Sequence, residues 1–234
     1  MKKTLLIIAL SAVTGLSYAD ESIKLETTQQ QASYTLGTDL AKNFESQGID
    51  IDTGALVQGM QDYLNKQPMK LTEEQMQSSI MALKKEMLAK QAAEKQKIAE
   101  ANAKAGAEFM ATNKKKPGVV TLPNGLQYLV LEEGQGESPA EGDYITANYK
   151  GTLIDGTEFD SSYNRGTPIE FQMGDVIQGW GEALKRMKPG AKWEIYVPPS
   201  LGYGAKGAGN IIGPNATLIF TIEFIMASKE KQSS

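Results

Sequence analysis

The fold of this 234-residue chain is decided by residues 144–162, which read YITANYKGTLIDGTEFDSS. The first ten, Tyr144 to Leu153, are rich in β-branched and aromatic side chains, which is typical of a strand. Asp155-Gly156 follows, and this dipeptide favours the tight turn of a β-hairpin because both positions tolerate positive φ. The stretch therefore predicts a strand that turns back into an antiparallel neighbour.

Further strands are expected on both sides of this stretch, at Gln127–Glu132, Lys192–Val197 and Thr217–Met226. In the last of these, alternation places Leu218, Phe220, Ile222, Phe224 and Met226 on one face. Turns are indicated at Pro123-Asn124-Gly125 and Lys188-Pro189-Gly190. Only Val176–Met187 has helical spacing, with Ile177, Trp180, Leu184 and Met187 on one side. The pattern predicts a curled antiparallel sheet closed over one short helix.

The residues before this sheet predict three helices. Apolar spacing favours a first helix over Gln29–Phe44, and Asp52 caps a second that ends before Pro68. Thr72 and Gln75 form a capping box, and no proline or glycine follows until Gly106. We therefore expect one helix from Glu73 to about Thr112, on the order of 60 Å long. The lysines and Pro117-Gly118 after it mark a domain boundary.

The two halves of this long helix differ in composition. Its first half carries an apolar stripe of Met76, Ile80, Leu83, Met87 and Leu88. Residues Ala89 to Lys104 are mostly alanine, lysine, glutamate and glutamine, with pairs such as Glu100 and Lys104 spaced to interact. We expect this second half to be solvated on all sides and to act as a spacer.

The apolar stripes of the three helices form a surface too small to close a stable core on one chain. Self-association through residues 20–90 would cover it, and a twofold homodimer is the simplest arrangement. The alternative is that these helices fold onto the C-terminal domain. The methionines of this region fit either as core and interface filler or as a flexible surface for varied apolar partners; they are Met60, Met69, Met76, Met81 and Met87.

The composition excludes several classes of chemistry. The chain has no cysteine and no histidine, so it can form neither disulfides nor thiolate or imidazole metal sites, and it lacks the usual catalytic triads. Its net charge of −4, with lysine and glutamate interspersed, argues against nucleic-acid binding. We expect no cofactor and no metal.

The first nineteen residues are typical of an export signal. Lys2 and Lys3 precede an apolar run, and small residues end at Ala19, where we expect cleavage. An uncleaved membrane anchor is the alternative, but the run is shorter than the roughly 20 residues of a span. No later segment is apolar enough to cross a bilayer. The mature protein is expected in the periplasm, with the outer membrane or the cell surface as further possibilities.

An ordered series of motifs resembles the FKBP family of peptidyl-prolyl cis–trans isomerases over residues 124–227. The motifs are YKGTL (149–153), DGTEFDSS (155–162), VIQGW (176–180), YG (203–204) and IIGPNATL (211–218). With the helices and the export signal, the layout resembles the Mip-like (macrophage infectivity potentiator) bacterial FKBPs, which are homodimers.

The resemblance implies an α+β chain in five parts. They are a signal peptide (1–19), an all-helical dimerisation domain (20–70), a long connecting helix (71–115), an FKBP-type isomerase domain of curled antiparallel sheet on a short helix (116–228), and a tail (229–234).

The resemblance also implies a pocket for proline. Its catalytic residues would be Tyr149, Phe159, Asp160, Ile177, Trp180, Tyr203 and Phe220, and its substrate-binding residues Arg165, Ile169, Val176, Ile211 and Ile212. Trp180 would form the floor, and the Ile177 N–H and the Tyr203 hydroxyl would donate to a substrate carbonyl. We further hypothesise that Asp160 pairs with Arg165.

Three positions depart from the commonest family pattern. Ala208 stands where many members have a histidine, Ile169 where an aromatic wall residue is common, and Gly213 where a proline often precedes Pro214. These departures concern substrate preference and macrolide affinity more than activity, because twisting an amide in an apolar pocket requires no proton donor.

The resemblance thus predicts an isomerase that accelerates X-Pro isomerisation in unfolded or exported proteins, is inhibited by macrolides such as rapamycin, and has chaperone activity as a dimer. The rival hypothesis is a chaperone or adhesion module that binds proline segments without useful turnover.

Overall fold

The computed structural model describes residues 24–231, so the predicted signal peptide and the last three residues of the tail lie outside the described chain. The chain divides into two compact units, the first ending at Ala82 and the second beginning at Leu83. Among residues 24–231, no helix combines the length and the apolarity that crossing a bilayer requires.

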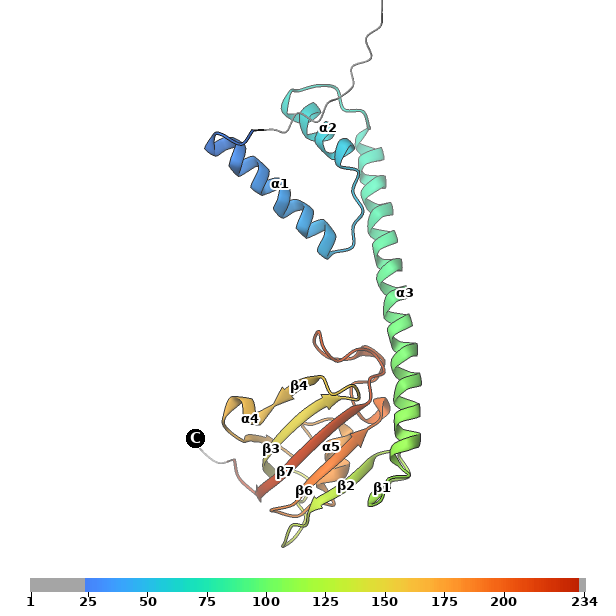
Figure 1. Cartoon of the computed structure of the whole chain (residues 1–234), viewed down its shortest axis with the longest axis vertical. Coiled ribbons are helices and arrows are strands. Elements are labelled where there is room, and N and C mark those ends of the chain that lie inside the picture. The colour runs from blue at the N-terminus through green and yellow to red at the C-terminus, as the bar shows by residue number, and fades with distance from the viewer. Residues whose placement is uncertain (1–23, 232–234) are drawn as a thin grey trace, which may run out of the picture. The chain divides into compact units, whose positions relative to one another are not determined.

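The first unit consists of α1 (Thr28–Ser46), α2 (Thr53–Leu64) and the start of α3 (Glu73–Asn113), as labelled in Figure 1. Asp52 caps α2 by accepting from the Ala55 N–H at 2.9 Å, and Thr72 and Gln75 bond to each other's backbone N–H groups at the start of α3. The predicted caps and the single long helix are therefore confirmed. A second capping box, between Thr27 and Gln30, starts α1.

The first unit leaves its apolar side chains exposed. Leu36 is 71% exposed and Tyr63 is 75% exposed, while Asp62 is the one buried residue between 24 and 82. A groove of about 610 Å³ runs between α1 and α2. Its apolar lining includes Leu36, Leu40, Ala41, Phe44, Ile49, Ile51, Leu56, Val57 and Met60. Within residues 24–82, the helices thus do not cover one another's apolar side chains.

The second unit contains an antiparallel sheet in the order β1-β2-β6-β7-β3-β4, with β5 also paired to β3. Figure 1 shows the sheet curving over α5 (Gln178–Leu184). The strands are β1 (Val119–Thr121), β2 (Gln127–Glu132), β3 (Tyr144–Leu153), β4 (Glu158–Ser161), β5 (Ile169–Gln172), β6 (Lys192–Val197) and β7 (Leu218–Ser228); the short helices are α4 (Ser162–Arg165), η1 (Pro199–Leu201) and η2 (Gly204–Lys206). This arrangement confirms the predicted α+β class with a sheet wrapped on a short helix.

The predicted bounds of β2, β3 and β6 are confirmed, whereas the short strands β1, β4 and β5 were not predicted. The placement of Met226 on the inner face is wrong. The pairing of β3 with β7 skips Ile225, so Ala147 lies opposite Phe224 but Thr146 lies opposite Met226. This bulge reverses the alternation, and Met226 therefore shares the outer face with Thr146.

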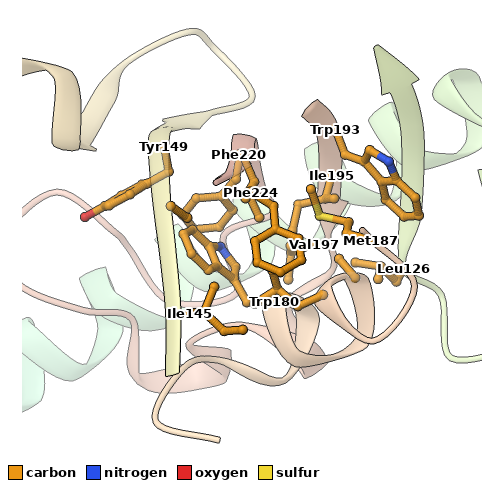
Figure 2. Close-up of a cluster of buried hydrophobic side chains, with 14 of the residues drawn as sticks. Leu126, Ile145, Tyr149, Trp180, Met187, Trp193, Ile195, Val197, Phe220 and Phe224 are labelled. Atoms are coloured by element: carbon orange, nitrogen blue, oxygen red, sulfur yellow. The ribbon is translucent and has the colours of Figure 1, made fainter. Parts of the chain in front are cut away.

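The core of the second unit lies between the sheet and α5. Trp180, Ala183 and Leu184 from α5 pack with inward-facing side chains of β3, β6 and β7, and Figure 2 shows Trp180 and Met187 among them. The helix itself is shorter than the predicted Val176–Met187, although both Ile177 and Met187 pack into or against the core. The core thus sets the position of Trp180 directly beneath the sheet.

The expectation that Ala89–Lys104 is solvated on all sides is wrong. Ala99 is only 8% exposed, and farther along α3 both Gly106 and Asn113 are buried. The Asn113 side chain donates to the Gln127 side chain at 3.0 Å, and Gln127 donates to the Met110 carbonyl at 2.9 Å. Ala99 and Gly106 are small, so this face of α3 can lie close to the rest of the second unit. The contact therefore does not depend on an apolar stripe, which is the signal that would have predicted it from the sequence.

Candidate functional site

A cavity of about 480 Å³ opens in the second unit beside β3, β4, the start of α5 and β7. Residues 203–217, here called the roof loop, close one side of it. The lining comprises Tyr149, Phe159, Asp160, Ile169, Asp175, Val176, Ile177, Trp180, Tyr203, Ala208, Gly209, Asn210, Ile211, Ile212 and Phe220. The structure therefore brings every predicted site residue to this cavity except Arg165. Arg165 does not line the cavity itself but donates hydrogen bonds to two residues that do, Asp160 and Tyr149.

Trp180 forms the base of the cavity, and only 4% of it is exposed. Its ring meets Tyr149 and Phe220 in edge-to-face geometry, with centroids 5.2 and 5.4 Å away. In Figure 2 these three side chains lie next to one another, with the Tyr149 hydroxyl pointing away from the core. Phe171, which the sequence did not indicate, supports Trp180 at 5.6 Å. Edge-to-face geometry is favourable for aromatic pairs, so these contacts stabilise the observed orientation of the Trp180 ring.

The walls are apolar on two sides. Phe159 from β4 meets Phe220 edge to face at 5.5 Å, and Val176 and Ile177 line the approach to α5. The Ile177 carbonyl accepts from the N–H groups of Trp180 and Gly181 at 3.0 and 3.3 Å. No residue in the described chain accepts from the Ile177 N–H itself. That N–H is thus available at the edge of an apolar cavity.

One polar network interrupts the apolar wall. The Asp160 carboxylate accepts from the Tyr149 hydroxyl and from the Arg165 guanidinium, and also from the Ser161 N–H at 2.8 Å. Arg165 further donates to the Tyr149 hydroxyl at 2.9 Å, and its guanidinium lies 5.5 Å from the Tyr149 ring centroid. Each member is held by the other two, so the network fixes the orientation of the Tyr149 ring.

The network keeps Asp160 ionised. Burial disfavours the charge, but hydrogen bonds from Tyr149 and Arg165 outweigh burial and hold the pKa of the Asp160 carboxyl below its ordinary value. Burial, followed by the adjacent carboxylate, raises the pKa of the Tyr149 phenol. The site therefore presents an ionised, hydrogen-bonded carboxylate at its edge.

The roof loop contributes the remaining lining. Ala208 and Ile212 exchange backbone hydrogen bonds at 2.9 and 3.2 Å, which bring Ile212 and the exposed Ile211 over the cavity. The Asn215 N–H donates to the Gly204 carbonyl at 2.8 Å and ties the two ends of the loop together. Gly209 and Asn210 of this loop also line the cavity, as does Asp175, which directly precedes Val176 and lies outside the loop. Small and polar residues of this kind show no periodicity, and the sequence therefore did not indicate them.

The cavity and the sheet that surrounds it define the class of protein. The model of the FKBP-type peptidyl-prolyl cis–trans isomerases matches residues 135–225, and the model of the domain amino terminal to such isomerases matches residues 29–130. The chain belongs to the FKBP-type peptidyl-prolyl cis–trans isomerase family, and it is an enzyme of that class.

Among its relatives are proteins of the Mip type. The chain is 45% identical over 226 residues to the outer membrane protein MIP of Legionella longbeachae, covering 97% of each chain. It is also 45% identical over 213 residues to the peptidyl-prolyl cis–trans isomerase Mip of Coxiella burnetii, covering 91% of this chain and 92% of the relative. The resemblance to Mip-like FKBPs expected from the sequence is confirmed.

A solved structure supports the fold independently. The crystal structure of FkpA from Escherichia coli matches with a TM-score of 0.73 and 37% identity, covering 87% of this chain and 98% of that one. A peptidyl-prolyl cis–trans isomerase from Pseudomonas syringae matches at 42% identity with a TM-score of 0.52 over 56% of this chain.

Proposed function

We propose that the cavity above Trp180 is the site where X-Pro bonds are isomerised. The observation that carries the proposal is an aromatic, largely apolar cavity in which the Asp160 carboxylate accepts hydrogen bonds from Tyr149 and Arg165. Rotation about an X-Pro bond breaks amide resonance against a barrier of about 18–20 kcal/mol. It requires no proton transfer, which suits a chain that lacks histidine and cysteine.

The mechanism follows from the properties of the twisted amide. Rotation removes resonance, so the transition state has less charge separation across the C–N bond than either planar state. An apolar cavity stabilises such a state relative to the planar amide, provided that the amide leaves water on entry. The proline ring would pack on Trp180 between Phe159 and Phe220, and these contacts would hold it in one orientation.

Two donors would fix the substrate backbone. The Ile177 N–H has no acceptor among the described residues, and the Tyr203 side chain stands half-exposed at the rim. Both would donate to substrate carbonyls. Asp160 and Arg165 would act through Tyr149, holding its ring as a wall of the cavity.

We further propose that the clients are proteins folding outside the cytoplasm. The predicted export signal supports this, as does the similarity to a Legionella relative that is named an outer membrane protein. The corresponding location is the periplasm, with association with the outer membrane or the cell surface as the alternatives.

The first unit supports a homodimer. Its apolar groove between α1 and α2 is open on a single chain, and a second copy carries the same side chains. Two pockets in one assembly would raise the effective concentration of a second site for any client that is already bound. The dimer would then bind an unfolded chain more tightly than either pocket alone, and this would give it chaperone activity.

Turnover of a proline-containing tetrapeptide tests the proposed activity. We expect Asp160→Ala to lower kcat/KM about tenfold, equivalent to about 1.4 kcal/mol, and Tyr203→Phe to lower it about fivefold. Rapamycin should block the wild-type enzyme. Tyr163→Phe is the matched control, because the hydroxyl of this exposed tyrosine bonds to Glu223 outside the cavity.

The rival function is a chaperone or adhesion module that binds proline segments without useful turnover. A wild-type protein that suppresses aggregation but fails to accelerate a proline-limited refolding phase would favour this rival. Full activity in both Asp160→Ala and Tyr203→Phe would mean that the reaction occurs elsewhere.

A further inference from the structure

The C-terminal half of α3 makes a specific contact with the roof loop, 112 residues away in sequence. The Asn102 side-chain amide donates to the Pro214 carbonyl at 2.9 Å. In Figure 1 the segment before β7 reaches this part of α3. A hydrogen bond to a backbone carbonyl fixes the position of the backbone, so Asn102 constrains the loop itself.

Gly213 is the residue that makes this contact possible. A Cβ atom at position 213 would lie 2.9 Å from the Asn102 amide nitrogen and 3.4 Å from the Ile98 Cγ2 atom. Any larger side chain there would have to displace the Asn102 amide from its hydrogen bond. The glycine that replaces the proline common in the family is thus explained by the approach of α3.

The contact continues along one stripe of α3. Ile98, Asn102 and Gly106 follow one another at intervals of four residues and therefore share a face of the helix. A Cβ atom at Gly106 would lie 2.3 Å from the Thr217 Oγ1 atom, so the helix touches both the middle and the end of the roof loop. Three helical positions thus meet three loop positions: 213, 214 and 217.

The same loop segment carries lining of the isomerase cavity. Ile211 and Ile212 directly precede Gly213, and both line the cavity above Trp180. On its other side Ile211 also borders a smaller space of about 210 Å³ that is lined by Ile98 and Asn102. A shift of the backbone at Gly213-Pro214 would therefore move Ile211 and Ile212 relative to Trp180.

We infer that Asn102 is a positioning residue for isomerisation: through the Pro214 carbonyl, it holds the roof loop over the cavity. The long helix is thereby part of the support of the active site, in addition to linking the two units. The inference rests on the proposed function of the cavity, but the contact can also be tested without turnover.

The first test compares Asn102→Ala, Asn102→Asp and the control Lys104→Ala in the full-length protein. Lys104 is exposed on the same helix and lies outside the stripe. Asn102→Ala should raise KM for the tetrapeptide and weaken rapamycin binding about fivefold, with kcat within twofold of wild type. Asn102→Asp should have the larger effect, because a carboxylate would face the Pro214 carbonyl. Lys104→Ala should leave all three quantities unchanged.

The second test is a double-mutant cycle with Gly213→Ala. Alone, Gly213→Ala should also raise KM, because its methyl group displaces the Asn102 amide. Combined with Asn102→Ala, which removes that amide, its effect should be less than additive. Strict additivity of the two changes would overturn the inference that they act through one contact.

A spectroscopic readout separates this inference from the proposed function. Backbone amide chemical shifts of Ile211, Ile212 and Tyr203 should change in Asn102→Ala and stay unchanged in Lys104→Ala, whether or not the protein turns over peptide. If the wild type lacks activity yet these shifts change, the proposed function fails and the contact stands. Unchanged shifts together with unchanged rapamycin affinity in both Asn102 variants would overturn the positioning role.

Discussion

Leu184 in the second unit and Leu36 in the first are the same side chain in opposite surroundings, 0% and 71% exposed. The second unit closes its core by wrapping a sheet on α5, and each inward-facing strand residue finds a partner within the same chain. The first unit consists of helices with apolar stripes but no layer to cover them. The second unit therefore encloses its core with its own residues, whereas the helices of the first unit leave their apolar side chains exposed.

A charged residue in the groove of the first unit should have the largest effect, because it would weaken the proposed dimer without changing the core of the second unit. Leu40→Asp would place a carboxylate in the proposed interface twice by symmetry, and the dimer should weaken about a thousandfold, or about 4 kcal/mol. Sedimentation equilibrium measures this weakening. Thr35→Asp, on the opposite face of α1, is the control and should leave the assembly intact. An unchanged dimer in Leu40→Asp would show that the groove is not the interface.

Truncating one leucine in each unit should show whether the stability of that unit depends on protein concentration. Leu184→Ala should lower the free energy of unfolding by about 3 kcal/mol, because it leaves a cavity in a closed core. Its effect should not depend on protein concentration. Leu40→Ala should have an effect that grows as the protein is diluted, since in the proposed dimer a second copy would cover this side chain. Denaturant unfolding at two protein concentrations distinguishes the two cases.

Enlarging a glycine should test the contact between α3 and the roof loop. Gly106→Ala would push its methyl group against Thr217, and we expect a loss of about 2 kcal/mol in unfolding free energy. Thr217→Ala removes the Oγ1 atom, which would lie 2.3 Å from the new methyl group, so the double variant should recover most of the loss. If stability is not recovered, the loss in Gly106→Ala does not come from a steric clash with Thr217.

The smallest expected effect concerns the pH dependence of the Asp160 network. The pKa of Asp160 is lower in the folded chain than its ordinary value of 3.8, so its contribution to stability is complete above about pH 4 and is lost as the pH falls through the lowered native value. Because this side chain is 44% exposed, we expect under about 1 kcal/mol. Acid unfolding of wild type and Asp160→Asn should converge below pH 3.8. Curves that stay parallel there would contradict this assignment.

The sequence predicted those parts of the fold whose signal is local. The bounds of β3 were predicted because aromatic and β-branched residues run unbroken to a turn at Asp155-Gly156, and the start of α3 because Thr72 and Gln75 form a cap. The four-residue strands β4 and β5 are too short to display a period, and the bulge at Ile225 leaves no mark in composition.

The site was predictable where the family motifs carry large side chains and unpredictable where tertiary contacts decide. Trp180 and Phe220 stand in motifs, whereas Gly209 and Asn210 reach the cavity only because Ala208 and Ile212 pair across the roof loop. Gly213 was visible as a departure from the family pattern. The structure explains this glycine by the close approach of Asn102. The sequence could not show this, because nothing in the pattern of α3 indicates which of its residues faces the loop.

The short edges of the sheet have a consequence for how the second unit meets extended chains. The outermost strands are β1, with three residues, and β4, with four, and β5 beside β3 is equally short. An extended client that arrives at the enzyme finds little unpaired backbone onto which it could add as a further strand. The short edge strands therefore leave few positions at which the sheet could serve as a template for aggregation.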